Sequence, residues 1–386
     1  MKPVRVALVG VGGIGGYHRR VLHNLPEFEF IAAAERHQDI QADAVAEVQS
    51  WGVPMYEDIW EMLDEVDVEG ICIACPHHFH AEYTLGCLER GIHVLCEKPT
   101  TVTIQDARAV AETAQRTELF AGVDFQYVSY PHSRQLKQML VDGVIGELRE
   151  IIGVLAWKRL DEYYTRSHWV GKRFVEGRPC FDGVLMNQAV HLLNSALQLG
   201  TRRPVFAEPV AMQAELYSVH AGIETEDLAC LRAQLDEATL YAYATTCKME
   251  GNERTTFEII GSEGTVTWDE SRALITRNNG EEIILDTPHD RDDIHRNWAQ
   301  CIRGEAEELY APASEGLKAT LAVNAAYSSA GRIQRITWDD AAEIGDLIDT
   351  ASDQRKLFSE MNIPWAYQGN KIDLTNYTEF QGEIVL

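Results

Sequence analysis

The sequence predicts two domains, an α/β domain with a doubly wound parallel sheet and then an α+β domain built on a large, mostly antiparallel sheet. Short apolar segments alternate with helix-like segments through residues 1–125, which is typical of a doubly wound sheet. A cluster of glycines follows the first apolar segment. Beyond residue 125 the β-rich segments become longer, as in α+β domains. We therefore expect domains at 1–125 and 126–386, the second ending in a C-terminal tail.

The expected strands of the first domain are short and apolar, as strands buried on both faces must be. The expected helices lie between them, and two helix ends carry recognisable signals. Gly91 stands in the C-cap place of one helix, and Thr103 with Asp106 resembles a capping box at the start of the next. The strands are expected at 4–9, 28–34, 70–74, 92–96 and 119–123, and the helices at 14–24, 40–49, 81–90 and 103–115.

The second domain is expected to begin with a helix over residues 130–142, ending at Gly143. Another helix, at 184–199, interrupts the β-rich part, and helices at 292–303 and 313–332 follow it. The polar segment after Asp339 predicts one more helix and a coil tail. The β-rich segments are expected at 148–158, 204–217, 227–248 and 254–268.

The composition excludes several classes of function. A formal net charge of −26 at pH 7 would repel a phosphate backbone, so we expect no nucleic-acid partner. The sequence has no run of about 18 apolar residues, so no membrane span is expected. The N-terminus lacks the features of a secretory signal, and the eight cysteines are scattered, unlike a disulfide framework. These observations favour a cytoplasmic protein.

Cys72 and Cys75 form a C-x-x-C motif, a pattern that elsewhere binds zinc or carries out redox chemistry. Here the motif ends an apolar strand, on which residues three apart face opposite sides. No second cysteine pair stands at the spacing of a zinc site. We therefore expect no metal site.

A dinucleotide site is predicted at the first glycine cluster. The G-x-G-x-x-G motif follows a buried strand and opens a helix, the context in which this motif binds a pyrophosphate. Glu35 ends the second expected strand, 25 residues after Gly10, where an acid can accept hydrogen bonds from the adenosine ribose and favours NAD. Arg36 and His37 follow directly and can instead hold a 2′-phosphate, so NADP stays open. The motif comprises Gly10, Gly12, Gly13, Ile14 and Gly15.

Four segments together resemble the glucose–fructose oxidoreductase/inositol dehydrogenase (Gfo/Idh/MocA) family. They are VALVGVGGIGG near the N-terminus, CPHHFHAE, the triplet Glu97-Lys98-Pro99, and GVLMNQAVHLLN at 183–194. The resemblance implies a Rossmann domain followed by a large open-faced sheet that usually serves oligomerisation, hence a homodimer or homotetramer. It also implies that Lys98 is catalytic and that Glu97 and Lys98 lie beside the nicotinamide, often with a cis peptide.

The resemblance further places Pro76 and His80 near the nicotinamide, with His80 supporting the loop. A histidine that merely caps or packs at the start of a helix is the alternative for His80. The chain departs from the family at two positions. Asn187 stands where many members have aspartate, and Asp124-Phe125-Gln126-Tyr127 stands where arginine is frequent.

Lys98 follows an expected strand and so lies at the carboxyl end of the parallel sheet, where ligands bind in such folds. Partial burial beside a positive nicotinamide should lower the pKa of this lysine. Its amine can then stabilise the alkoxide that develops as hydride leaves. Asn187 and His191 are four residues apart on one expected helix and so share a face. His191 suits a general base and Asn187 would orient the substrate or the imidazole, although a lone histidine here can equally be a packed core residue.

A cluster of aromatic and arginine residues lies between the first strand of the second domain and this helix. Aromatic faces and forked donors suit a sugar ring, or a sugar that carries a carboxylate or sulfonate. The alternative is a packed loop with solvated arginines. The expected substrate-binding residues are Gln126, Arg159, Tyr163, Tyr164, Arg166, Trp169, Asn187 and His191.

The hypothesis that follows is an NAD(P)-dependent oxidoreductase acting on a hydroxyl of a sugar, sugar acid or polyol, with Lys98 and His191 in acid–base roles. Two alternatives remain open. An NAD-dependent glycosidase would use the same residues for transient oxidation and elimination, without net reduction of the cofactor. A non-catalytic, dinucleotide-responsive regulator would keep the glycine motif, but the presence of Lys98 and His191 argues against it.

Overall fold

The computed structural model describes residues 2–247, 253–288, 290–337, 344–361, 363, 371–375 and 377. The chain forms two compact units, which we call the N-terminal unit and the sheet unit. The N-terminal unit comprises residues 1–101, 106–129 and 290–316, and the sheet unit comprises 102–105, 130–289 and 317–386. The expected boundary at residue 125 lies near the crossing after residue 129. Neither the inclusion of 102–105 in the sheet unit nor the return of 290–316 to the N-terminal unit was predicted.

The N-terminal unit contains the predicted parallel sheet. Its six strands are ordered β3-β2-β1-β4-β5-β6, and every neighbouring pair is parallel. The chain therefore proceeds outward in both directions from β1 and β4, which creates a topological switch point at their carboxyl ends. The strands are β1 Val4–Val9, β2 Phe28–Ala34, β3 Met55–Tyr56, β4 Gly70–Ile73, β5 His93–Cys96 and β6 Ala121–Val123.

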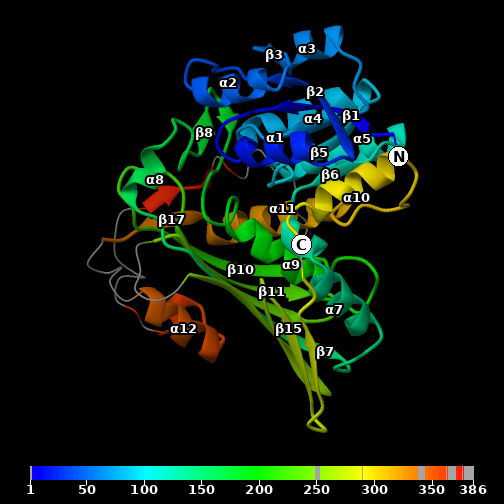
Figure 1. The fold of residues 1–386 in the computed structure, drawn as a ribbon. Coiled ribbons are helices and arrows are strands. Elements are labelled where there is room, and N and C mark those ends of the chain that lie inside the picture. Colours follow the sequence, from blue (N-terminus) through cyan, green and yellow to red (C-terminus); the bar gives the residue numbers. More distant parts are fainter. Residues whose placement is uncertain are drawn as a thin grey trace. The chain divides into compact units, whose positions relative to one another are not determined.

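The helices of this unit follow the predicted alternation, with short additions at 59–65, 77–79 and 126–129 (Figure 1). The helix predicted at 292–303 also lies in this unit and not in the second domain. The short helix α3 was not predicted, although Asp58 caps it by accepting hydrogen bonds from the N–H groups of Trp60 and Glu61. The helical elements are α1 Gly15–Asn24, α2 Ala42–Ser50, α3 Ile59–Glu65, the 3₁₀ turn η1 His77–Phe79, α4 His80–Glu89, α5 Ile104–Thr117, α6 Gln126–Ser129 and α10 Asp293–Ile302.

A large side chain of helix α10 packs in the core of the N-terminal unit. Trp298 is completely buried, and its ring lies so close to Gly70 that a Cβ on that glycine would approach it to 2.7 Å. The indole also packs against Phe28, with ring centroids 5.8 Å apart. Glycine in β4 thus makes room for a tryptophan from a distant segment, a pairing that strand periodicity alone does not reveal.

The sheet unit is built on ten strands in the order β16-β15-β14-β13-β7-β12-β11-β10-β17-β18. Most pairs are antiparallel, but β7 runs parallel to β12 and β10 parallel to β17, so the sheet is mixed. The strands are β7 Leu148–Ala156, β10 Pro209–Ser218, β11 Leu228–Leu235, β12 Thr239–Thr245, β13 Arg254–Gly261, β14 Gly264–Asp269, β15 Ala273–Arg277, β16 Glu282–Leu285, β17 Arg332–Arg335 and β18 Lys371–Asp373. The large sheet predicted for this part of the chain is confirmed.

Helices pack on both faces of this sheet. Gly153 of β7 contacts Leu192 of α9, whereas Ile152 and Val154 belong to a core cluster with Ile348 of α12. Since successive residues of a strand point to opposite faces, α9 and α12 lie on opposite sides, so α12 covers part of the face expected to be open (Figure 1). The remaining elements are α7 Pro131–Val141, α8 Asp161–Thr165, β8 Phe174–Val175, β9 Arg178–Pro179, α9 Ala189–Leu199, α11 Ala313–Ala330, α12 Ile344–Gln354 and η2 Phe358–Met361.

The expected helix after Asp339 corresponds to α12, while most of the expected coil tail lies outside the described residues. Among the helices that are described, none combines the length and the apolar character needed to cross a membrane.

Candidate functional site

The glycine turn between β1 and α1 has the backbone that the motif predicts. Gly10 and Gly13 have φ values of 85° and 53°, which residues with a Cβ rarely adopt. A Cβ on Gly10 would lie 2.4 Å from the carbonyl oxygen of Ala74, and one on Gly15 would lie 2.0 Å from that of Gly10. Ile14, at the tip, is 40% exposed. Gly10 and Gly15 therefore pack closely against main-chain carbonyls, whereas the tip of the turn is exposed. A turn that binds a pyrophosphate at a helix N-terminus needs such an exposed main chain.

Glu35 is tied to this turn. Its Oε2 accepts a hydrogen bond from the Val11 N–H at 3.1 Å, and its Oε1 accepts one from the His37 N–H at 3.1 Å. The carboxylate therefore sits beside the glycine motif at the carboxyl end of β2, where an acid can meet ribose hydroxyls. The next residue, Arg36, places its guanidinium 5.7 Å from the centre of the Phe79 ring.

The Lys98 loop follows β5, at the same edge of the sheet. The Lys98–Pro99 peptide bond is cis. His80 lies between this loop and the segment after β4, because its Nδ1 is 2.7 Å from the Pro99 carbonyl oxygen and its Nε2 is 2.9 Å from that of Cys75. Burial lowers the pKa of His80, so the neutral ring donates to one of the two carbonyls. Cys75 directly precedes Pro76, so His80 links two of the segments expected near the cofactor.

Glu97 was expected beside the cofactor, but its carboxylate is turned into the unit. The residue is only 4% exposed. Its Oε2 accepts the main-chain N–H of Lys98 at 3.1 Å, and its Oε1 lies 3.0 Å from Nε2 of His18. His18 was not singled out from the sequence, although a histidine on the buried side of an amphipathic helix is a signal that could have found it.

In the sheet unit, Asn187 precedes the helix that carries His191. Helix α9 begins at Ala189, later than the predicted start at 184, so the expectation that both residues lie on one regular helix is wrong. Buried side chains satisfy the turn before it: Asp182 accepts a hydrogen bond from Asn187 Nδ2 at 2.7 Å, and Glu226 accepts one from the Leu185 N–H at 3.0 Å. Asn187 and His191 remain close in sequence and almost fully buried, at 7% and 5% exposure.

Asp182 supplies the carboxylate that the sequence seemed to lack at position 187. Its Oδ1 faces the Asn187 amide, and its Oδ2 accepts the Gly171 N–H at 2.9 Å. The amide nitrogen of Asn187 is thereby fixed toward Asp182. Asp182 lies before the predicted start of the helix at residue 184, so the helical spacing did not indicate this partner.

Changing Asn187 to aspartate, the residue frequent in the family, is therefore expected to destabilise this chain. Two buried carboxylates would replace a 2.7 Å amide–carboxylate hydrogen bond, so one of them must take up a proton. We expect the free energy of unfolding at pH 8 to fall by about 1–3 kcal/mol, and by less at pH 5. Urea denaturation of Asn187→Asp at both pH values measures this.

The matched control exchanges the two groups, combining Asp182→Asn with Asn187→Asp. This double variant restores one amide and one carboxylate, and should recover most of the lost stability. Equal stability of Asn187→Asp and the wild type at pH 8 would show that Asp182 does not orient Asn187.

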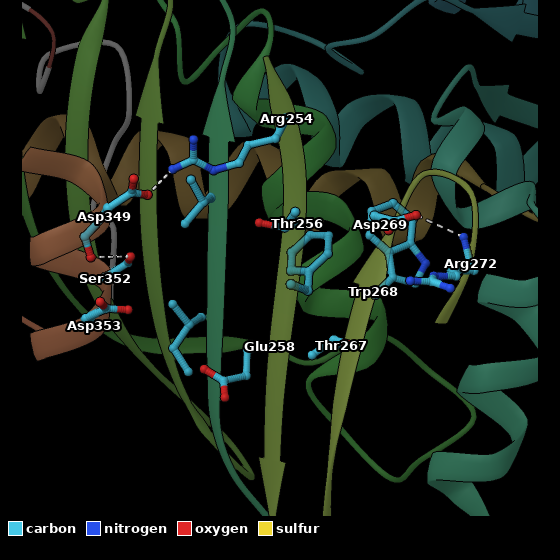
Figure 2. Close-up of a pocket in the computed structure, with 13 residues that line it drawn as sticks. Arg254, Thr256, Glu258, Thr267, Trp268, Asp269, Arg272, Asp349, Ser352 and Asp353 are labelled. Carbon is cyan, nitrogen blue, oxygen red and sulfur yellow. Dashed lines mark hydrogen bonds and ion pairs between the residues drawn. The ribbon is translucent and has the colours of Figure 1, made fainter. Parts of the chain in front are cut away.

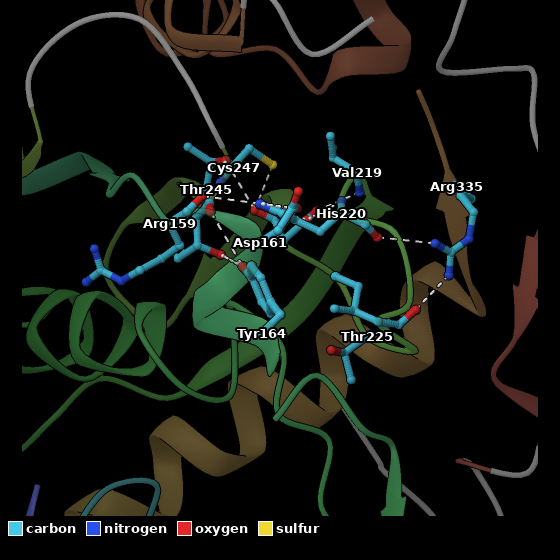
Figure 3. Close-up of polar contacts among 12 residues, drawn as sticks. Arg159, Asp161, Tyr164, Val219, His220, Thr225, Thr245, Cys247 and Arg335 are labelled. Atoms are coloured by element: carbon cyan, nitrogen blue, oxygen red, sulfur yellow. Dashed lines mark hydrogen bonds and ion pairs between the residues drawn. The ribbon is translucent and has the colours of Figure 1, made fainter. Parts of the chain in front are cut away.

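The predicted substrate cluster divides into two parts. Tyr164 is an anchor, since its hydroxyl lies 2.8 Å from Thr246 Oγ1 and its ring packs 4.4 Å from that of His220 (Figure 3). His220 in turn lies 2.6 Å from a carboxylate oxygen of Asp227 and 3.2 Å from the main-chain oxygen of Arg159. These contacts hold the segment around α8 to the sheet.

The second part surrounds Tyr163. The guanidinium carbons of Arg166 and Arg159 lie 3.5 and 5.4 Å from the centre of its ring, and its hydroxyl accepts a hydrogen bond from Gln188 Nε2 at 2.7 Å. Gln188 directly follows Asn187, so Tyr163 and its arginines are linked to the start of α9. Trp169 contributes its main-chain oxygen to the N–H of Lys172 at 3.2 Å. Gln126 begins α6 in the N-terminal unit.

A separate hollow lies on the large sheet between its strands and α12 (Figure 2). Its volume is about 380 Å³, and its lining includes Arg254, paired with Asp349 of α12. Asp269, which accepts hydrogen bonds from the Ser271 and Arg272 N–H groups, lies at another side. None of the lining residues is among those predicted for the active site.

Two family models match this chain, and both are consistent with the fold described above. Residues 4–125 match the family model described as "Oxidoreductase family, NAD-binding Rossmann fold", and residues 133–267 match the GFO/IDH/MocA C-terminal domain. The chain belongs to the Gfo/Idh/MocA family of oxidoreductases, and its N-terminal unit contains that family's NAD-binding Rossmann fold. The resemblance inferred from the sequence is thus confirmed.

Named relatives act on sugars. D-glucoside 3-dehydrogenase of Escherichia coli is 31% identical over 203 residues, which cover 50% of this chain and 53% of the relative. Levoglucosan dehydrogenase of Pseudarthrobacter phenanthrenivorans is 25% identical over 205 residues, covering 52% of each. The chain thus spans about half the length of the curated relatives it matches.

Two solved structures show the same fold at low sequence identity. The WlbA dehydrogenase from Bordetella pertussis, in complex with NADH and UDP-GlcNAcA, matches with a TM-score of 0.69 at 22% sequence identity. The match covers 85% of this chain and 97% of the WlbA chain. An inositol dehydrogenase homologue from Azotobacter vinelandii, complexed with NADH and myo-inositol, has a TM-score of 0.71 at 19% identity, with coverage of 85% and 96%.

Proposed function

We propose that this protein is an NAD-dependent oxidoreductase that transfers hydride between the nicotinamide and a hydroxyl of a sugar, sugar acid or polyol. One observation carries the proposal: three segments meet at the carboxyl edge of the parallel sheet. The glycine turn follows β1, the Cys75-Pro76 segment follows β4 and Lys98 follows β5, and these strands are neighbours in the sheet. In such folds the crevice at this edge is the ligand site.

The glycine turn fits a dinucleotide, since Cβ atoms on Gly10 or Gly15 would collide with the main chain that forms it. When bound, NAD supplies the hydride acceptor. Residues of the chain then accept and stabilise the proton and charge of the reacting hydroxyl. The Lys98 amine donates a hydrogen bond to the reacting oxygen and stabilises the negative charge that grows there. His191 takes the hydroxyl proton as general base, and Asn187, fixed by Asp182, presents its amide oxygen to hold the imidazole or the substrate.

The sheet unit supports a carbohydrate substrate. Two guanidinium groups, those of Arg166 and Arg159, lie 3.5 and 5.4 Å from the centre of the Tyr163 ring, which is joined through Gln188 to the start of α9. An aromatic ring with forked donors nearby suits a sugar bearing a negative charge. Asn194, buried on α9, makes no side-chain hydrogen bond within the described part of the chain, which leaves a polar group for a hydroxyl or a water.

The test is a panel of sugars, sugar acids and polyols, each incubated with NAD or NADP while absorbance of the reduced cofactor is followed. We expect substrate-dependent reduction, faster with NAD and strongest among acidic sugars. Release of a free sugar from glycosides without net cofactor reduction would instead indicate the glycosidase. Ligand-induced stabilisation ranks the cofactors independently, because saturation at 100 times Kd adds about 2.7 kcal/mol.

A further inference from the structure

A chain of buried polar side chains lies directly behind the Lys98 loop, within the N-terminal unit. His18 of α1 is completely buried, and Asp124, which follows β6, is 1% exposed. Nε2 of His18 lies 3.0 Å from Oε1 of Glu97 and 3.6 Å from Oδ2 of Asp124. Nδ1 of His18 lies 2.9 Å from Nε2 of His295 on α10. Three separate segments thus place titratable groups around the imidazole of His18.

The hydrogen-bond pattern assigns the charges. Glu97 accepts the N–H of Lys98 through Oε2 and faces His18 through Oε1, as an ionised carboxylate does. Burial opposes a charge on His18, but Cys72 and Glu97 raise its pKa well above the ordinary value. Burial and His18 together lower the pKa of His295. His18 is therefore an imidazolium that donates to Glu97 on one side and to neutral His295 on the other.

Asp124 is the group of this cluster that can change its charge near neutral pH. Burial and the adjacent Glu97 carboxylate raise the pKa of Asp124 to about 7. Burial opposes ionisation of Glu97, but the hydrogen bond and positive charge of His18 hold its pKa well below the ordinary range. Below pH 7 the two carboxyl groups thus carry one negative charge, matched by His18, and above pH 7 they carry two.

Burial favours the neutral forms of Cys72, Tyr17, His77 and His80, which also face the cluster. Burial raises the pKa of the Cys72 thiol on β4 and of the Tyr17 hydroxyl on α1. Tyr17 donates a hydrogen bond to Asp292 at 2.6 Å, and its ring lies 4.1 Å from the Arg291 guanidinium carbon. On the side of the Lys98 loop, burial lowers the pKa of both His77 and His80.

We propose that His18, Glu97 and Asp124 are positioning residues for Lys98, and that the proton on Asp124 controls how firmly His18 holds the Glu97 carboxylate that accepts the Lys98 main-chain N–H. This rests on the proposed function, since it assumes that Lys98 acts on the substrate. Glu97 accepts the Lys98 main-chain N–H at 3.1 Å and lies 3.0 Å from Nε2 of His18. When Asp124 ionises, its carboxylate, 3.6 Å from the same nitrogen, competes with Glu97 for the imidazolium, so the Lys98 loop is held less firmly and turnover falls.

The test compares Asp124→Asn, a neutral mimic of the protonated residue, with the wild type between pH 5 and 9. The wild type should lose kcat with a midpoint near pH 7, and the variant should lack this loss, so that the variant-to-wild-type ratio of kcat rises at least threefold from pH 6 to 8.5. KM for NAD should change less than twofold. His18→Gln, which cannot carry the positive charge, should lower kcat at least tenfold at every pH.

A second measurement needs no substrate. The folded-state pKa of Asp124 lies above its unfolded value, so its contribution to stability is present at low pH and is lost as the pH rises toward 7. The melting temperature of Asp124→Asn should therefore rise relative to the wild type between pH 4 and 7, with a constant difference above pH 7. Parallel curves for the two proteins would overturn the proposal. Diverging curves without sugar oxidation would retain the charge switch and reject only the proposed function.

Discussion

Lys98→Met is expected to lower kcat about 10²–10³-fold, the usual cost of removing one donor that stabilises a developing oxyanion. Methionine keeps much of the side-chain length but supplies neither a proton nor a charge. The main-chain N–H of residue 98 still reaches Glu97 in the variant, so the loop should keep its position. The affinity for NAD, measured by tryptophan fluorescence or thermal stabilisation, should therefore change less than about threefold. Steady-state rates on the best sugar of the panel give the readout.

The matched control is Lys172→Met. Lys172 forms a surface ion pair with Glu224 at 3.0 Å in the sheet unit, and exposed pairs contribute little to stability. Its loss should leave kcat within twofold of the wild type. A third variant, Lys98→Arg, keeps the positive charge but cannot release a proton, and it separates the two roles of the amine. If Lys98→Met retained more than a tenth of wild-type turnover, Lys98 would not be the group that stabilises the oxyanion.

Local sequence signals predicted the parallel sheet well. Strands such as β1 and β4 are buried on both faces, so their residues must be apolar throughout, and this pattern is visible without knowledge of their neighbours. The glycine turn was equally predictable from the sequence, because its glycines are required locally, either by the backbone conformation or by the lack of space for a Cβ. The two-residue strand β3 lies below the length at which any periodicity can be recognised.

Contacts between distant segments were not predictable in this way. Nothing in the run around Trp298 indicates that its indole packs on Gly70, yet this is one of the contacts that join residues 290–316 to the N-terminal unit. The same holds for His18 and Asp124, which meet Glu97 only because parallel strands and α1 bring their ends together. Polar groups in a core are governed by their partners, and those partners are set by topology.

The segment around Asn187 shows why a motif can mislead in detail. A regular helix from 184 would have given Asn187 and His191 a common face, but Glu226 and Asp182 provide hydrogen bonds that a non-helical turn can use instead. A side chain that satisfies the backbone competes with helix formation. The conformation of the segment that carries Asn187 therefore depends on two carboxylates from elsewhere in the chain.

Gly15→Ala is expected to abolish NAD binding and to destabilise the N-terminal unit, whereas the neighbouring Gly16→Ala is expected to do neither. A Cβ at Gly15 would lie 2.0 Å from the carbonyl oxygen of Gly10, so the main chain of the cradle itself must move. The glycine turn would then lose the shape in which its N–H groups converge on a pyrophosphate. We expect the free energy of unfolding to fall by about 2–4 kcal/mol, within the range of severe steric substitutions.

Gly16 is the control because it is the next glycine in the chain, and it differs from Gly15 in the atoms that surround it. It lies in the same first turn of α1, and a Cβ there would approach the far ends of the Arg19 and Arg20 side chains, at 3.1 and 3.8 Å. Alanine is favoured over glycine in a helix by about 1 kcal/mol, so Gly16→Ala should match or exceed the stability of the wild type. Isothermal titration with NAD and urea denaturation distinguish the two variants. Equal NAD affinity in both would mean that the cofactor does not rest on the backbone between Gly10 and Gly15, and the crevice at the carboxyl edge of the sheet would lose its assigned ligand.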